Sequence, residues 1–134
     1  MLSENIRTEK FRDDITRVLN RHGYDEKNIL YVEDVHEWEM KNYPETLSYP
    51  FTPAMCRRNP ETGEVLIVIN KNFSSDHILH SILPAMWIRG IKDTERLEDD
   101  WYFTQHTILH EIAHSKGIAN EKEADIWAFK NMIW

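Results

Sequence analysis

The first thirty-five residues carry a helical pattern followed by a short apolar run. From about Ser3 to His22, apolar residues recur every three or four positions, which is the spacing of one helix face. Ser3 suits the start of this helix and Gly23 suits its end. The run Ile29–Val32, within about Asn28 to Val35, predicts the first strand of a small sheet.

The middle of the chain alternates between irregular and strongly patterned segments. From His36 to Pro53 no periodicity holds, so we expect a long aromatic loop that either covers the functional site or forms poorly ordered surface. Ala54 to Arg58 and Val65 to Ile69 flank a turn-forming Asn-Pro-Glu-Thr-Gly-Glu segment, which predicts a β-hairpin. A helix from about Asp76 to Arg89 follows, and Pro84 should bend it or split it in two.

Two more helices are predicted in the last third of the chain. The first begins at Asp99–Asp100, whose acidic side chains suit a helix start, and ends at Lys116–Gly117. The second begins after Asn120, a good capping residue, and runs from Glu121 to about Ile133. One side of the first helix is apolar and suits a core, and the other side carries the residues of chemical interest. These are Phe103, His106, Thr107, His110 and His114.

Length and composition fit one compact α+β domain that spans residues 1–134. Of the 134 residues 41% are hydrophobic, which is enough for a single core. The formal charge of -7 at pH 7 opposes binding to nucleic acid or to an anionic membrane surface, and no long basic cluster offsets it. Composition leaves the oligomeric state open.

Targeting signals and cysteine content favour a cytoplasmic protein. The N-terminus lacks the apolar segment of a signal peptide, and the most apolar run, Ile78 to Ile88, is too short to span a bilayer. The single cysteine, Cys56, cannot form an internal disulfide, which agrees with a reducing compartment. Cys56 is expected to be a small buried side chain, and the alternative is an inhibitory ligand that masks a metal ion.

The segment that carries the most specific chemistry is Thr107-Ile108-Leu109-His110-Glu111-Ile112-Ala113-His114. Positions i and i+4 of a helix differ by roughly 40° around its axis, so His110 and His114 project from one face, one turn apart. Two imidazoles at this spacing can share one metal ion. Glu111 leans from the side of the same face, where it can reach a water without being a ligand. The pattern His-Glu-x-x-His is that of zinc peptidases, in which the metal acidifies a water and the glutamate accepts its proton.

The histidines of this chain also have plainer interpretations. His110 and His114 could be two surface residues of an ordinary amphipathic helix, although about 0.04 chance matches to the motif are expected in a chain of this composition. His77 and His80 are three positions apart within a predicted helix. No carboxylate or third histidine is placed to complete a second metal site with them.

Two motifs lie close together between Thr107 and Ala128. The first is Thr-x-x-His-Glu-x-x-His, and the second, at Glu121 to Ala128, is Glu-x-Glu-Ala-Asp-x-Trp-Ala. Together they resemble the zincin metallopeptidases of the gluzincin kind. The second is similar to the Glu-x-x-Ala-Asn-x-Phe-Ala motif common in the small ImmA/IrrE-like peptidases. In gluzincins the third ligand is a glutamate on the next helix, so the resemblance implies Zn²⁺ bound by His110, His114 and Glu121.

Sequence spacing and helix geometry also indicate which residue is the third ligand. Only seven positions separate His114 from Glu121, fewer than is usual in gluzincins, and the sequence after His114 also resembles the metzincin pattern His-x-x-Gly-x-x-His. That frame would place Asn120 in the site, but an amide is a poor zinc ligand and a good helix cap. Glu121 and Asp125 share a helix face, whereas Glu123 is rotated by roughly 200° from Glu121. We expect Glu121 as the ligand and Asp125 as the hydrogen-bond partner of a ligand imidazole. Glu123, Asn120, Asp125 and a residue outside this segment remain the alternatives.

These expectations combine into a small zincin-like α+β domain with a short sheet, an active-site helix and a C-terminal helix that supplies the third ligand. The implied function is a zinc-dependent metallopeptidase, a hydrolase of peptide bonds in an intracellular protein or peptide, with Glu111 as base. In zincins a sheet edge above the active-site helix pairs with extended substrate, and the predicted hairpin is a candidate for that role. The alternative is a zincin-fold interaction or inhibitor module that binds a partner without cleaving it, although a structural zinc site needs no base. Another zinc-dependent hydrolase is the third option.

Overall fold

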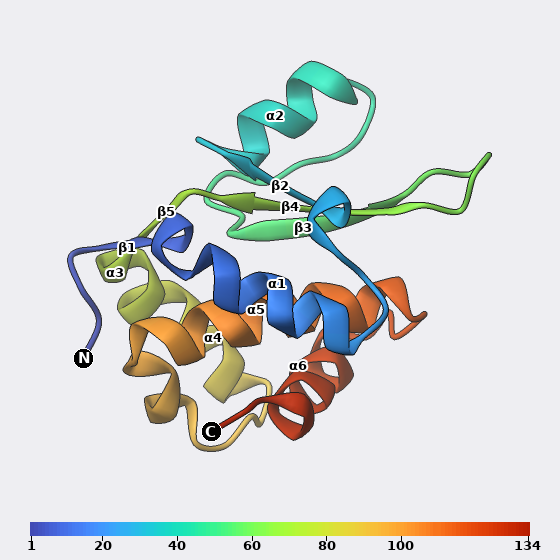
Figure 1. The fold of residues 1–134 in the computed structure, drawn as a ribbon. Helices are drawn as coiled ribbons and strands as arrows, with labels where there is room; N and C mark the ends of the chain where they lie inside the picture. Colours follow the sequence, from blue (N-terminus) through green and yellow to red (C-terminus); the bar gives the residue numbers. More distant parts are fainter.

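A three-stranded mixed sheet separates one short helix from the other helices of the molecule (Figure 1). The computed structural model describes residues 1–134. In the sheet, β4 (Val65–Asn70) lies between β2 (Ile29–Val32), which runs parallel to it, and β3 (Ala54–Arg58), which runs antiparallel. Helix α2 (Val35–Asn42) lies on one face of the sheet, and the other helices lie on the opposite face. The predicted α+β class is confirmed.

The predicted hairpin is present, and its two arms have different places in the sheet. β3 and β4 pair in antiparallel register over five residue pairs. At the turn, the Asn59 side chain accepts hydrogen bonds from two backbone N–H groups that follow it, at 2.9 and 3.3 Å. β4 contains three consecutive buried residues, Ile67–Ile69, because it is the central strand, whereas β3 forms an edge.

The N-terminal helix is shorter than the sequence pattern predicts. We expected a helix from about Ser3, but Asn5–Arg7 forms β1, which pairs antiparallel with β5 (Asn72–Ser74). Ser3 does not cap a helix, because its N–H and its hydroxyl both donate to the carboxylate of Asp100. After a 3-10 turn, α1 spans Arg12–Arg21. The prediction failed because β5, which pairs with β1, and Asp100, which binds Ser3, both lie far away in the sequence.

The stretch from His36 to Pro53 is not one long loop, as we had expected. Its first part belongs to α2, which begins after the capping residue Asp34. Hydrophobic periodicity misses this helix because only two of its residues are buried. The rest of the stretch is irregular, and only its end, at Thr52 and Pro53, lines the pocket described below.

The helix predicted from about Asp76 to Arg89 is present and irregular in its middle. α3 (Ser75–His77) continues through a π-helical turn at Ile78–Ile82 into α4 (Leu83–Ile88). Pro84 lies in the first turn of α4, where its missing N–H interrupts the regular ladder of helical hydrogen bonds. The predicted effect of this proline is therefore confirmed.

The two helices that carry the candidate site are α5 (Asp100–Ser115) and α6 (Glu121–Asn131). Asp99 caps α5 by accepting hydrogen bonds from two backbone N–H groups, as its position in the sequence predicts. Asn120 caps α6 in the same way. None of the helices combines the length and the apolar composition that crossing a bilayer requires.

The core lies between the sheet and the helices α1 and α5. The predicted apolar side of α5 is confirmed, because Ile108, Leu109 and Ile112 are fully buried. They belong to one cluster with apolar residues of α1 and β4, which include Ile15, Leu19, Ile67 and Ile69. Three 3-10 turns connect the main elements, at Thr8–Phe11, Glu26–Asn28 and Thr94–Glu98.

The end of the chain is held against α5 by a buried glutamine. Helix α6 stops at Asn131 and does not reach the predicted end near Ile133. Gln105 of α5 donates from Nε2 to the carbonyl of Ile133 at 3.2 Å and accepts from its N–H at 2.7 Å. Because Gln105 itself is fully buried, these bonds satisfy its amide group and hold the segment after α6 against α5.

Replacing Gln105 by methionine, which has a similar shape, should therefore lower the free energy of unfolding by about 1–3 kcal/mol, the cost of leaving buried polar groups unpaired. Urea titrations followed by circular dichroism would measure the change. Asn131→Ala is the matched control, because its side chain bonds only to Trp127 within α6. Equal losses in the two variants would contradict the role given to Gln105.

Candidate metal centre

A tight reversal after α5 brings the two predicted motifs together. Gly117 adopts a positive φ of 94°, and the N–H of Ile118 donates back to the carbonyl of Ala113 at 3.1 Å. The chain therefore turns back at once, and the first residue of α6 returns beside the last turn of α5. In this way Glu121 reaches His114 although only seven positions separate them.

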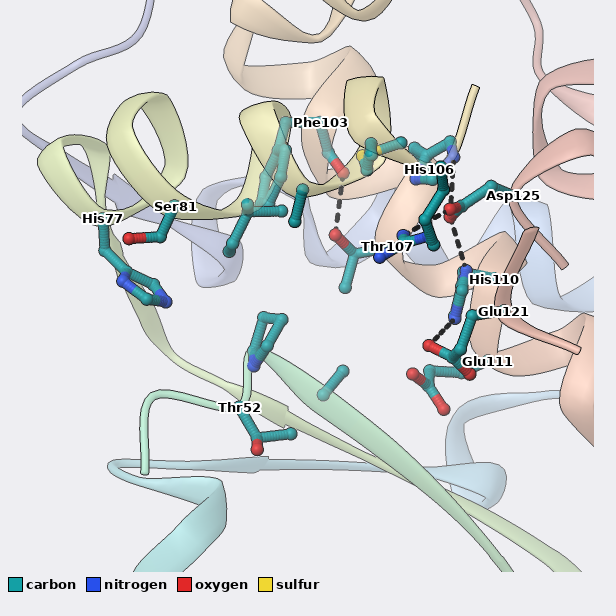
Figure 2. Close-up of a pocket in the computed structure, with 16 residues that line it drawn as sticks. Thr52, His77, Ser81, Phe103, His106, Thr107, His110, Glu111, Glu121 and Asp125 are labelled. Atoms are coloured by element: carbon teal, nitrogen blue, oxygen red, sulfur yellow. Dashed lines mark hydrogen bonds and ion pairs between the residues drawn. The ribbon is translucent and has the colours of Figure 1, made fainter. Parts of the chain in front are cut away.

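The candidate metal ligands predicted from the sequence converge on one point. Figure 2 shows two of them, His110 and Glu121, side by side. Glu121 approaches His114 Nε2 with Oε1 at 2.7 Å and His110 Nε2 with Oε2 at 3.3 Å. The two Nε2 atoms are 3.0 Å apart. The potential ligand atoms of the three residues all lie within 4.8 Å of one another, and no other group of three or more such residues occurs in the chain.

The donor set and its spacing suit a zinc ion. Two imidazole nitrogens and one carboxylate oxygen are ligands that zinc favours at catalytic centres, where the fourth position stays open. Tetrahedral bonds of about 2.0–2.1 Å place neighbouring ligand atoms about 3.3 Å apart. The Nε2 pair at 3.0 Å needs to separate by about 0.3 Å and the His114–Glu121 pair at 2.7 Å by about 0.6 Å, and the Glu121 side chain is 58% exposed and free to adjust. The residues therefore fit the ion.

Hydrogen bonds at the far nitrogen of each ring orient both imidazoles. His110 Nδ1 lies 2.7 Å from Oδ1 of Asp125, and His114 Nδ1 lies 2.7 Å from the carbonyl oxygen of Ile118. Both partners are acceptors, so each Nδ1 carries the proton and donates it. In the neutral form of each ring, the lone pair of Nε2 is then directed to the shared point, which is the tautomer that a metal ligand needs.

Asp125 is itself held in place by a residue of another helix. It is 2% exposed, and its Oδ2 accepts a hydrogen bond of 2.6 Å from Arg89, the residue that follows α4. Burial alone would raise the pKa of Asp125, but hydrogen bonds from His110 and Arg89 outweigh it and lower that pKa. Sequence reasoning missed Arg89, because nothing near it in the chain indicates a partner 36 positions away.

His106 lies on the same side of α5 and contributes to the surroundings of Asp125. It is 4% exposed, and its Nε2 is 3.6 Å from Asp125 Oδ1, too long for a hydrogen bond. Its ring centroid lies 4.8 Å from that of Phe129. Burial lowers the pKa of His106 to about 4, so this side chain is a neutral packing residue behind the ligands.

The same contacts shift the pKa values of the three candidate ligands. Burial acts to lower the pKa of His110, but hydrogen bonds to Asp125 and Glu121 outweigh it and raise that pKa to about 10. The hydrogen bond to Glu121 also raises the pKa of His114. In return, the two imidazoles hold the pKa of Glu121 below its usual range. The cluster therefore attracts positive charge, which a bound cation can supply in place of protons.

Glu111 lies beside the three candidate ligands but does not belong to their group. Its side chain comes from the same helix, is 8% exposed, and faces the pocket next to Glu121 (Figure 2). Burial raises the pKa of Glu111 to about 7, although the neighbouring imidazoles act in the opposite direction. The structure therefore has a buried carboxylate beside the candidate ligands, as the motif predicts.

The other candidate metal ligands from the sequence lie outside the group of His110, His114 and Glu121. Glu123 is exposed, and Asn120 uses its side-chain oxygen to accept a hydrogen bond of 3.0 Å from the N–H of Glu123. His80 is paired with exposed Asp76 at 3.5 Å, outside any cluster of ligand residues. Cys56 is half-buried in β3 and does not belong to the group around Glu121. Burial raises its thiol pKa to about 11, which disfavours the thiolate that a metal requires.

Comparison of the chain with protein-family models, curated proteins and solved structures found no match.

If Glu121 is the third ligand, Glu121→Gln should lower zinc affinity more than 100-fold, beyond the roughly 10–100-fold typical of residues that only orient a ligand. Competition with a chromophoric chelator would give the affinities. Glu123→Gln, which changes an exposed carboxylate two positions away, is the matched control and should bind zinc like the unaltered protein. A larger loss for the control would show that the wrong glutamate has been assigned.

The role of Asp125 gives a separate prediction. Asp125→Asn keeps the shape of the side chain but weakens the hydrogen bond to His110, so zinc affinity should fall by roughly 10–100-fold. Asp76→Asn removes a fully solvated carboxylate near another histidine and should leave the affinity unchanged. Unaltered affinity in Asp125→Asn would mean that orientation of His110 does not depend on this contact.

Proposed function

We propose that this protein is a zinc-dependent metallopeptidase that hydrolyses peptide bonds of a cytoplasmic protein or peptide. The observation that carries the proposal is the convergence of His110, His114 and Glu121 beside a pocket that Glu111 lines together with two of them. A purely structural zinc site would need four ligands and no additional buried carboxylate. Here the chain offers three candidate ligands, with the buried carboxylate of Glu111 beside them.

Each residue then has a definite task. Zinc, when bound, supplies a Lewis acid that acidifies water and polarises a carbonyl group. Glu111 accepts a proton from the attacking water and passes it to the departing amine, since its carboxylate is close to the ligands but outside their group. Asp125 and the carbonyl of Ile118 keep both histidine rings in the tautomer with a free Nε2. Arg89 holds Asp125 in position for this task.

The proposal also includes membership of the zincin metallopeptidases, on the strength of the two motifs between Thr107 and Ala128. The helix–turn–helix arrangement that brings Glu121 to the two histidines is what the gluzincin pattern requires. The negative formal charge of -7 supports a protein or peptide substrate over a nucleic acid.

Glu111→Gln separates an enzyme from a module that only binds a partner. The amide cannot accept the proton of the attacking water, so hydrolysis should fall by at least about 100-fold, the usual contribution of general acid–base catalysis. Zinc content and the unfolding midpoint should stay close to those of the unaltered protein, because Glu111 is not a ligand. The assay would use casein and a mixed peptide library, with zinc measured by atomic absorption.

Two results would contradict the proposal. Undiminished hydrolysis by Glu111→Gln would reject the role of this carboxylate as base. No hydrolysis of any substrate by the zinc-loaded unaltered protein would favour an interaction or inhibitor module on the same fold.

A further inference from the structure

The pocket beside the candidate metal centre extends well beyond the metal-binding residues. It has a volume of about 360 Å³, and Figure 2 shows that Glu111 and Glu121 lie at one end and His77 and Ser81 at the other. The irregular helix α3–α4 forms one wall, and the start of β3 lies opposite. Because one end of this space contains Glu111, a group bound in it lies next to the reacting atoms of any substrate.

The walls between these two ends are apolar apart from Thr52 and Thr107, whose hydroxyl groups donate to the backbone carbonyls of Tyr49 and Phe103. Ile82, Ala85 and Met86 come from α3–α4, and Phe103 comes from α5. Met86 and Phe103 are almost fully buried, so their positions are fixed by the core. Pro53 and Ala54 close the space from the side of the sheet. Such a lining favours an aliphatic or aromatic group that leaves water.

The distribution of charge excludes an ionised group from the middle of the pocket. The acidic residues of the lining, Glu111, Glu121 and Asp125, lie toward the metal end. Arg89 is at the same end, because it contacts Asp125. Arg89 is already paired with Asp125 at 2.6 Å, so it is not a free partner for a substrate carboxylate. At the far end the ring of His77 packs against that of Phe51 at an angle of 38°, with centroids 5.2 Å apart. A charged side chain in the middle would therefore be buried without a counter-ion.

The volume sets the size of the group that fits. An apolar cavity of about 150 Å³ binds benzene, and this pocket is more than twice as large. We propose that the pocket binds one large apolar side chain of the peptide substrate, of the size of leucine, methionine or phenylalanine, adjacent to the bond that is cleaved. This specificity rests on the peptidase function proposed above. Ala85, the small residue in the wall of α4, determines how large that side chain can be.

The test is to fill the pocket from Ala85 and to compare substrates. Ala85→Phe places a ring in the space, so the zinc-loaded protein should lose at least about 10-fold in kcat/KM on peptides with leucine, methionine or phenylalanine at the selected position. Matched peptides with alanine or glycine there should change by less than about 2-fold. A peptide library with every position randomised would first identify the selected position in the unaltered protein.

The control variant adds the same ring outside the pocket. Ile88 lies on the same helix, is 79% exposed and does not line the pocket, so Ile88→Phe should leave the preference unchanged. Ala85→Leu is a smaller filling that covers the case in which Ala85→Phe fails to fold, with zinc content and circular dichroism as checks. A preference for charged side chains, or equal effects of Ala85→Phe and Ile88→Phe, would overturn the proposal.

Indole binding gives a measurement that does not depend on hydrolysis. Indole should shift the amide resonances of Ile82, Ala85, Met86 and Phe103, and Ala85→Phe, but not Ile88→Phe, should abolish these shifts. If the protein cleaves nothing and indole still binds in this way, the pocket assignment stands and the peptidase proposal fails. Absence of indole binding to the unaltered protein would overturn the pocket assignment itself.

Discussion

The reversal of the chain at Gly117 is the constraint on which the candidate metal centre depends. A residue with a side chain would be strained at its φ of 94°, and the hydrogen bond from Ile118 to Ala113 closes the turn. Because the turn is so short, Glu121 comes back to His114 in the first turn of α6. The capping of α6 by Asn120 then sets the helix register that directs Glu121 and Asp125 to one side.

Around this turn, a chain of hydrogen bonds links three helices to the candidate ligands. Arg89 at the end of α4 contacts Asp125 of α6, and Asp125 contacts His110 of α5. Asp125 is buried, so its charge is tolerated only because both partners compensate it. The same Arg89 borders the apolar pocket, so the packing of α4 affects the orientation of His110 as well as the shape of the proposed substrate pocket.

Local patterns predicted the parts of the structure that depend on neighbours in the sequence. The caps at Asp99 and Asn120, the hairpin and the shared face of Glu121 and Asp125 follow from spacings of a few residues. The failures involve distant partners or weak patterns. Strand β1 exists because β5 pairs with it, and α2 buries too few residues to show a helical period. Arg89 was missed for the same reason, since its contact with Asp125 joins separate helices.

X-ray absorption spectroscopy of the zinc-loaded protein tests the central claim most directly, because it identifies the atoms bound to the metal. The proposed centre predicts nitrogen and oxygen neighbours at about 2.0–2.2 Å, with the outer-shell scattering of two imidazole rings, from His110 and His114. It also predicts no sulfur neighbour. A zinc–sulfur distance of about 2.3 Å, which only Cys56 or a methionine could supply, or a first shell without imidazole, would contradict the account.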